Sequence, residues 1–569
     1  MTTAPSYLIV GGGSAGCVLA ARLSEDRTCQ VTLVEAGRDF APADTPADIL
    51  DTYAGRALGN RSYFWDLAVR RGADVPHLSA PERKPLHYEQ AKVMGGGSSI
   101  NGQVALRGLP VDFDRWAALG ATGWNWEGVL PYFRKLETDL DFNGPMHGAS
   151  GPIPIRRFFR DGWDQFTLSV SREWERQGYS YLEDLNGNWS DGFAPIPVSN
   201  DGQRRVSTAL GYLTDEVRQR QNLTILSRTQ AHRILFDDEL RATGLEVSDA
   251  QGDRRTLSAD RVVLSAGVFR TPWLLLSSGI GPGAHLAERG VSVLQDRPGV
   301  GRNLQDHPLI SISAYLNSAA RAAGASRRNF AYLRYTSKLA PGRDSDMIMM
   351  AICRSSWHAV GKRIGTLAAN LAYAFSRGSV RLSPLGPTAG PDVEFNWLAD
   401  QRDRARMMDA FRRMAALYAS AGVSQYASYP FPSSYSARVR LLQKSTFKNA
   451  ALTSVGAALM DSSDFIRRMI IRGVIQDTPP VEHLLKDEQA LEAYVCRNVG
   501  STFHPVGTCR LGAEADRDAV VDPRGRVIGT RNVYVADASL MPEVTRTNTN
   551  LPAIMIGEKV ADLLATTTA

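Results

Sequence analysis

The hydrophobic pattern of the first 40 residues predicts a strand, a tight turn, a helix and a second strand. Apolar residues fill Tyr7–Val10, small residues follow at 11–16, helix-forming residues occupy Cys17–Ser24, and a β-branched run covers Val31–Glu35. A strand–helix–strand unit of this kind begins a parallel sheet with helices on both faces. The chain therefore opens with an α/β domain.

The same order of strand, turn and helix returns twice later in the chain. Residues 261–280 contain an apolar strand, a turn and a helix, and residues 533–565 repeat this order near the C-terminus. Between about 310 and 400, apolar and polar residues alternate, as in 377–384 and 392–398, which predicts an antiparallel sheet. Residues 403–420 have helical periodicity. We therefore predict a second domain inserted into the first.

Gly11, Gly13 and Gly16 form a G-x-G-x-x-G motif between the first strand and the first helix. Here the first glycine permits the turn, the second lets the backbone approach a pyrophosphate, and the third lets the helix pack on the strand. Glu35 ends the next strand, where an acid hydrogen-bonds ribose hydroxyls. The pattern predicts a dinucleotide site but does not separate FAD from NAD.

The chain has 569 residues, a formal net charge of +6 and five cysteines. No block of Lys and Arg indicates nucleic-acid binding, no His/Cys group has metal-site spacing, and no apolar run is long enough for a transmembrane helix. No basic segment with an apolar core precedes the first strand, and the cysteines are few and odd in number. We expect a cytoplasmic protein that binds neither a metal nor nucleic acid.

Five further segments, in order, resemble signature motifs of the glucose–methanol–choline (GMC) oxidoreductase family. They are AKVMGGGSSINGQVALRGLPVDFD (91–114), AGVFRTPWLLLSSGIG (266–281), PGVGRNLQDH (298–307), STFHPVGTCRLG (501–512) and VADASLMPEVTRTNTNLPAIMIGEKVAD (535–562). Within the family, residues 108–133 and 146–155 are similar to oxidases of 5-hydroxymethylfurfural and aryl alcohols. The resemblance extends from about residue 5 to 565, with minor departures at Met94 and Val268.

The resemblance implies an α/β, Rossmann-like FAD-binding domain of the GMC type. This domain is interleaved with an α+β substrate domain built on an antiparallel sheet. We assign residues 1–155, 205–310 and 495–569 to the FAD-binding domain, and residues 156–204 and 311–494 to the substrate-binding domain.

The resemblance also implies which residues hold FAD. The expected contacts are Gly11, Gly13, Ser14, Ala15 and Gly16 at the pyrophosphate, Glu35 at the adenosine ribose, Ala231 at the adenine, Val93, Gly97, Ser98 and Asn101 in the loop along the isoalloxazine, Asp537 and Ala538 at the ribityl–phosphate portion, and Asn550 and Pro552 at the pyrimidine edge. Relatives that attach FAD covalently use a histidine just before the loop asparagine, where this chain has Ile100. We therefore expect a non-covalent flavin.

The resemblance places the catalytic pair at His504 and Asn548. Alcohol oxidation removes a hydroxyl proton, and histidine has a pKa suited to a general base. His504 is the expected base, Asn548 orients the substrate oxygen, and FAD accepts the hydride at N5. Thr502 and Phe503 are candidates for substrate contact, with a packing role equally open. His307 is expected to hold its turn.

The favoured function is oxidation of primary aryl or furan-type alcohols to aldehydes, with O2 as the acceptor. A dehydrogenase that passes electrons to a quinone or another acceptor has the same reductive half-reaction and stays open. A hydroxynitrile lyase with a non-redox flavin and an inactive flavin-binding protein are further alternatives. The His504/Asn548 pair argues against the last, because binding alone needs no base.

Residues 425–480 look longer than the corresponding stretch of furan-alcohol oxidases and mix basic with apolar residues. The basic residues are Arg438, Arg440, Lys444, Lys448, Arg467, Arg468 and Arg472, and the apolar ones are Leu441, Leu442, Phe447, Phe465, Ile466, Met469, Ile470 and Ile471. A solvated helix pair, a lid, an oligomer contact and a peripheral membrane element all fit this pattern. The sequence leaves monomer and dimer open.

Overall fold

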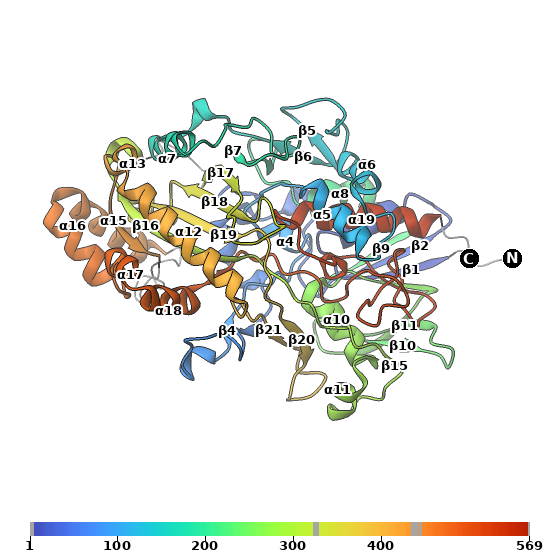
Figure 1. The fold of residues 1–569 in the computed structure, drawn as a ribbon. Helices are drawn as coiled ribbons and strands as arrows, with labels where there is room; N and C mark the ends of the chain where they lie inside the picture. Colours follow the sequence, from blue (N-terminus) through green and yellow to red (C-terminus); the bar gives the residue numbers. More distant parts are fainter. Residues whose placement is uncertain (1–4, 322–328, 434–441, 443–445, 567–569) are drawn as a thin grey trace.

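A computed structural model describes residues 5–321, 329–433, 442 and 446–566. A five-stranded parallel sheet forms the core of one half of the molecule. Its order is β24 (Val533–Val535), β13 (Arg261–Leu264), β1 (Ser6–Val10), β2 (Gln30–Val34) and β9 (Leu223–Leu226). These strands come from the beginning, the middle and the end of the chain. Helix α1 (Gly16–Leu23) packs on β1 and β2 and against α19 (Asn550–Ala565) in the same half (Figure 1).

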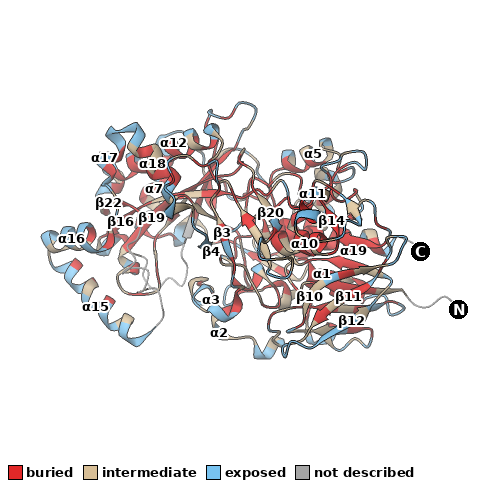
Figure 2. Ribbon diagram, turned by 90° about the horizontal axis from the view of Figure 1, so that it is seen from below, coloured by how far each residue is buried: buried red, intermediate tan, exposed pale blue. Residues whose placement is uncertain are grey.

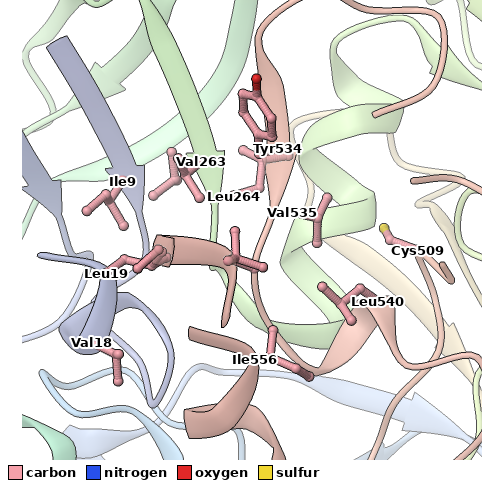
Figure 3. Close-up of a cluster of buried hydrophobic side chains, with 14 of the residues drawn as sticks. Ile9, Val18, Leu19, Val263, Leu264, Cys509, Tyr534, Val535, Leu540 and Ile556 are labelled. Atoms are coloured by element: carbon pink, nitrogen blue, oxygen red, sulfur yellow. The ribbon is translucent and has the colours of Figure 1, made fainter. Parts of the chain in front are cut away.

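Apolar side chains fill the space between this sheet and its helices. Ile9, Val263 and Val535 come from three neighbouring strands and belong to one cluster with Leu19 of α1 and Ile556 of α19 (Figure 3). All five are fully buried. Because helices and loops cover both faces of a parallel sheet, its strands are continuous apolar runs, and this is the pattern that the sequence shows.

A three-stranded antiparallel sheet packs beside the parallel one. It consists of β10 (Gln230–Phe236), β11 (Ala242–Ser248) and β12 (Arg254–Ser258). β11 contacts β13, and helix α10 (Gly267–Ser277) contacts β10.

An antiparallel sheet of seven strands forms the other half (Figure 1). Its order is β22 (Ala427–Pro432), β16 (Pro308–Leu316), β19 (Ile364–Leu371), β18 (Met347–Ile352), β17 (Asn329–Tyr335) and β7 (Gly192–Pro195), and β23 (Gly500–Ser501) pairs with the beginning of β16. Helices α12 (Gln401–Ala419) and α7 (Gln165–Arg176) pack on it. The antiparallel sheet and the helix predicted in this part of the sequence are both present.

One part of that prediction needs correction. Residues 377–384 and 392–398 do contribute an antiparallel pair, β20 (Ser379–Leu382) and β21 (Pro391–Glu394), but not to the large sheet. β21 pairs with β3 (Ala68–Arg70), which pairs with β4 (Leu86–His87). The separate sheet forms because its partner strand comes from a segment more than 300 residues earlier in the chain.

The remaining elements are short. The strands are β5 (Glu137–Asp139), β6 (Ile153–Arg156) and β8 (Val198–Ser199) in one sheet, and β14 (Ile280–Gly281) and β15 (Gln295–Asp296) in another. The helices are α2 (Ala47–Leu50), α3 (Gly55–Leu58), α4 (Gly97–Ile100), α5 (Pro110–Ala118), α6 (Trp126–Leu136), α8 (Thr208–Tyr212), α9 (Asp215–Arg218), α11 (Gly283–Glu288), α13 (Ala421–Ser424), α17 (Val481–Lys486) and α18 (Glu488–Asn498). Single helical turns lie at Pro42–Asp44, Arg61–Tyr63, Pro81–Arg83, Arg160–Gly162, Ser318–Ala320, Gly361–Arg363 and Ala538–Leu540.

The predicted insertion, residues 425–480, begins with β22 of the large sheet, and its residues 447–475 form a helical hairpin. It contains α15 (Phe447–Ser462), α16 (Asp464–Ile470) and a π-helical turn at Ile471–Ile475. The hairpin lies at the edge of the molecule, and much of its surface is exposed (Figure 2). Arg438, Arg440, Leu441 and Lys444 of the sequence prediction lie outside the described residues. Across the described chain, no helix is both long and apolar enough to cross a bilayer.

Candidate active site

A cavity of about 510 Å³ lies between the two halves of the molecule. One side is formed by the carboxyl ends of β1 and β2 and by the glycine turn that follows β1. The opposite side is formed by side chains of β16, β17, β18 and β19. Ligands of open α/β sheets bind at the carboxyl ends of the parallel strands, so this cavity is in the expected place for a dinucleotide.

Packing explains two of the three motif glycines but not the third. A Cβ on Gly16 would lie 1.9 Å from the carbonyl oxygen of Gly11, and a Cβ on Gly11, whose φ is +103°, would lie 2.4 Å from the carbonyl oxygen of Ser265. At Gly13 the nearest described protein atom to such a Cβ is 3.9 Å away. Because Gly13 lines the cavity, its missing side chain leaves room for a ligand rather than for the protein.

Most of the residues predicted to hold the cofactor line this cavity. They are Gly11, Gly13, Ser14, Ala15, Glu35, Val93, Gly97, Asn101, Ala231, Asp537, Ala538 and Asn550. Gly16, Ser98 and Pro552 are not part of the lining. Gly16 packs against the turn, the Ser98 hydroxyl donates to the carbonyl oxygen of Gly95 at 2.6 Å, and Pro552 is buried within α19.

Glu35 is buried and stabilises the glycine turn. One carboxylate oxygen accepts from the N–H of Gly12 at 2.8 Å and the other from the N–H of Gly37 at 2.6 Å. Burial raises its pKa, and the two N–H groups oppose that shift. The same carboxylate lines the cavity at the end of β2, as predicted for a residue that meets a ribose.

Two arginines at the site were missed by the sequence analysis. Arg270 lines the cavity, and its guanidinium carbon lies 3.3 Å from the centre of the Trp65 ring. Burial lowers the pKa of Arg270 to about 10. A cation here suits the negative charges of a diphosphate. Arg205 is fully buried, and burial lowers its pKa to about 9. It donates to the Asn101 side chain at 2.8 Å and to the Ser98 carbonyl at 3.1 Å, so it fixes the loop along the cavity.

The predicted catalytic pair meets at the cavity wall. The ring nitrogen Nε2 of His504 lies 2.9 Å from the side-chain nitrogen of Asn548, and both residues line the cavity. Burial, and secondarily the neighbouring His307, lower the pKa of His504 well below 6.5. The ring is therefore neutral at neutral pH, the state in which an imidazole can accept a proton.

The other edge of the His504 ring faces Thr502 and His307. The sequence analysis gave Thr502 as a candidate for substrate contact and His307 as a residue that holds its turn. Its Nδ1 lies 3.0 Å from the Thr502 hydroxyl and 3.0 Å from Nδ1 of His307. Thr502 lines the cavity, yet its hydroxyl also donates to the carbonyl oxygen of His307 at 2.8 Å. His307, expected to act only within its turn, thus contacts the predicted base directly.

Phe503 is the strained residue of the site. Its φ is +61°, in the left-handed region that a residue with a bulky side chain rarely adopts. Its N–H donates to the Ser501 hydroxyl at 2.7 Å, and its ring lies 5.0 Å from the ring of Tyr88. Phe503 lines the cavity while remaining 46% exposed, so it lies at the mouth of the cavity.

The wall opposite the glycine turn is mostly apolar. Leu309, Tyr332, Met350 and Ile352 line the cavity from β16, β17 and β18, and Asn370 of β19, which lies between β16 and β18, adds an amide. Cavities of this composition bind flat apolar molecules and use a few polar groups to orient them.

A second buried cluster of charged groups lies outside this cavity. Glu137, Asp139 and His147 come within metal-ligand distance of one another, but Arg107 pairs with Glu137 and Arg157 with Asp139. Their carboxylates raise the pKa of His147 to about 10 against the effect of burial. His147 is therefore the buried cation of an ion-pair cluster.

Comparison with known proteins decides the family. Two models described as GMC oxidoreductase match residues 5–309 and 374–557. The chain belongs to the GMC oxidoreductase family. The resemblance of the sequence motifs is thereby confirmed, and the chain is an FAD-dependent oxidoreductase that acts on alcohols.

Full-length relatives agree with this assignment. The chain is 37% identical to 5-(hydroxymethyl)furfural oxidase of Methylovorus sp. (strain MP688) and covers 98% of each sequence. It is 32% identical to an oxygen-dependent choline dehydrogenase of Rhizobium johnstonii, with 98% of this chain and 94% of the relative covered. The crystal structure of pyridoxine 4-oxidase from Mesorbium loti superposes with a TM-score of 0.81 at 28% identity, covering 99% of this chain and all of the other.

The lowered pKa of His504 predicts the pH dependence of the reductive step. A general base works only when unprotonated, and a pKa well below 6.5 moves the loss of activity to lower pH. We expect the rate of anaerobic flavin reduction by an alcohol to stay constant from pH 8 down to pH 6. A base with a pKa of 6.5 would lose about three quarters of that rate at pH 6, and stopped-flow traces showing such a loss would contradict this prediction.

Proposed function

We propose that this enzyme oxidises primary aryl or furan-type alcohols to aldehydes, with His504 as the base and O2 as the electron acceptor. The observation that carries the proposal is the His504–Asn548 pair at the wall of a mostly apolar cavity. The relative with 37% identity is named for oxidation of 5-(hydroxymethyl)furfural, which supports a furan-type substrate.

The chain's own residues account for the proton and the orientation of the substrate. Nε2 of His504 takes the hydroxyl proton, and the side-chain N–H of Asn548 donates to the substrate oxygen. When bound, FAD supplies the hydride acceptor, so that loss of a proton and a hydride from the same CH–OH group gives the aldehyde. Phe503 packs against the aromatic ring of the substrate at the cavity mouth.

The reaction is tested by mixing the purified holoenzyme anaerobically with 5-hydroxymethylfurfural, benzylic alcohols and aliphatic alcohols. Bleaching of the flavin band followed by rapid recovery in air, with hydrogen peroxide formed, is the expected result. Bleaching with slow recovery would favour the alternative acceptor, a quinone. An unbleached flavin with every alcohol would contradict the proposal and favour the hydroxynitrile lyase reading.

The glycine turn allows cofactor binding to be separated from folding. Gly16→Ala should lower the free energy of unfolding by about 3 kcal/mol, because its Cβ collides with the carbonyl of Gly11. Gly13→Ala has room within the protein and should leave the unfolding of the FAD-free protein nearly unchanged while weakening FAD binding at least tenfold. Thermal unfolding of the FAD-free protein and flavin titration measure the two effects. Equal FAD affinity in Gly13→Ala and the wild type would refute the role of this glycine.

The flavin is proposed to be held without a covalent bond, because Ile100 occupies the position where covalent relatives have histidine. Denaturing the holoenzyme in acid and filtering off the protein should release all of the FAD into the filtrate. Yellow colour that stays with the precipitated protein would overturn this assignment.

For the helical hairpin we propose contact with an anionic membrane surface. Part of its apolar surface faces outward: Phe447 is 91% exposed, Phe465 70% and Met469 59%, whereas Met460, Ile471 and Ile475 are buried. The same helices expose Lys448 and Arg472. Apolar side chains flanked by cations suit the boundary between anionic headgroups and acyl chains.

Sedimentation with vesicles tests the hairpin. The wild type should bind vesicles containing phosphatidylglycerol and release them at high salt, and the variant Phe465→Ser/Met469→Ser should not bind. Leu385→Ser removes an apolar residue that is 88% exposed outside the hairpin and should bind as the wild type does. A wild type that stays in solution but loses a dimeric state in the Phe465→Ser/Met469→Ser variant would identify the surface as a subunit contact instead.

We also propose a cytoplasmic location. All five cysteines are buried and none of them is in a disulfide, as expected in a reducing compartment. Fractionation of the source cells, with activity recovered outside the cytoplasm and its adhering membrane, would contradict this.

A further inference from the structure

The hydroxyl of Thr502 has two neighbours that together fix its proton. Its oxygen lies 2.8 Å from the carbonyl oxygen of His307 and 3.0 Å from Nδ1 of His504. A hydroxyl has one proton, and a carbonyl oxygen can only accept. The proton therefore points to His307, and the lone pairs of the Thr502 oxygen face the His504 ring.

This arrangement requires a proton on Nδ1 of His504. A bare nitrogen would place its lone pair against those of the Thr502 oxygen, whereas an N–H donates to them. The second neighbour fits the same assignment, because Nδ1 of His307 also lies 3.0 Å from Nδ1 of His504. Two N–H groups or two lone pairs would repel at this distance, so His307 presents a lone pair.

His307 can present that lone pair because its own proton is on the other nitrogen. Burial lowers the pKa of His307 to about 4, so the ring is neutral, and the carbonyl groups of Ala372 and Thr545 favour a proton on the ring. With Nδ1 as the acceptor, the proton of His307 is on Nε2, a buried nitrogen that makes no hydrogen bond of standard geometry within the described chain. Among the described contacts, the charged group beside the two rings is Asp306. Its carboxylate accepts from the backbone N–H groups of His307 and His504.

The assignment leaves Nε2 of His504 without a proton. This nitrogen faces the cavity, where the side-chain N–H of Asn548 donates to it at 2.9 Å. All the contacts around the His504 ring, on both of its edges, are therefore satisfied by one tautomer.

We propose that Thr502 and His307 are positioning residues that hold His504 in the tautomer whose Nε2 carries no proton and can take that of the substrate once the alcohol displaces the Asn548 N–H from this nitrogen. This inference rests on the proposed function, in which His504 is the base. With the opposite tautomer, Nε2 carries a hydrogen and offers no lone pair to the alcohol. The partner of the second ring nitrogen sets which nitrogen reacts, and once His504 has taken the proton, both acceptors stabilise its positive charge.

The kinetic test compares Thr502→Val, which keeps the shape and loses the oxygen, with Thr502→Ser, which keeps the oxygen. Thr502→Val should slow anaerobic flavin reduction about 10- to 100-fold, the effect of losing a hydrogen bond to a group that becomes charged. The dissociation constant of the alcohol should change less than threefold, and Thr502→Ser should recover most of the rate. His307→Asn, which retains an acceptor, should likewise be faster than His307→Leu.

A matched control separates positioning from packing. Thr366→Val makes the same change at a buried hydroxyl of β19 that pairs with Ser313 at 2.8 Å, away from the cavity lining. It should reduce the flavin at the wild-type rate. Equal rates in Thr502→Val and the wild type, or equal slowing in Thr366→Val and Thr502→Val, would overturn the proposal.

A spectroscopic test is independent of activity. In holoenzyme labelled with nitrogen-15 at histidine, and assigned with His504→Gln, we expect the His504 signals of a neutral ring protonated at Nδ1. Thr502→Val should add signal from the Nε2-protonated form, and Thr502→Ser should not. A wild-type ring protonated at Nε2 would refute the inference. If none of the tested alcohols reduced the flavin but the His504 ring showed the expected tautomer, the proposed function would be refuted and the tautomer assignment would stand.

Discussion

The active site depends on one buried carboxylate, that of Asp306. One oxygen accepts from the backbone N–H groups of His307 and His504 at 2.8 and 3.0 Å, and the other accepts from the Ser501 hydroxyl at 2.5 Å. Burial raises the pKa of Asp306 to about 6 despite these donors. A buried acid is tolerated where such donors surround it. These hydrogen bonds join two segments almost 200 residues apart. The donors that stabilise the buried carboxylate of Asp306 therefore also bring the rings of His307 and His504 together.

The interleaved order of the two halves along the chain agrees with the position of Asp306. The turn that contains Asp306 leads directly into β16 of the large antiparallel sheet, and β23, just before His504, pairs with the beginning of β16. The chain then returns to the parallel sheet through β24 and ends in α19. The glycine turn thus forms one side of the cavity. The other side is formed by strands of the large sheet, to which β23, just before His504, is hydrogen-bonded. A cofactor in this cavity would contact residues of both halves.

Local patterns in the sequence were sufficient for the parts of the site that local geometry determines. The glycine motif, helix α1 and the acid at the end of β2 lie within 30 positions of one another, although the close packing at Gly11 also involves Ser265. The pairing of His504 with Asn548 came from family resemblance, because 44 residues separate them. Arg205 was missed since its acceptors, Asn101 and the Ser98 carbonyl, lie about 100 residues earlier. β21 joined an unexpected sheet for the same reason: alternation predicts a strand but not its distant partner.

The strain at Phe503 connects these observations. Thr502 and His504 are two residues apart, and side chains at this spacing face the same side of an extended chain. The left-handed backbone of Phe503 bends the chain between them, and the Thr502 hydroxyl lies 3.0 Å from the His504 ring. The bond from the Phe503 N–H to Ser501 and the bonds to Asp306 offset a conformational cost of about 1–3 kcal/mol. A flexible segment would let the His504 ring rotate and exchange its two nitrogens. Because these bonds are formed before any substrate arrives, the reactive nitrogen already faces the cavity, and little reorganisation is needed in the reaction itself.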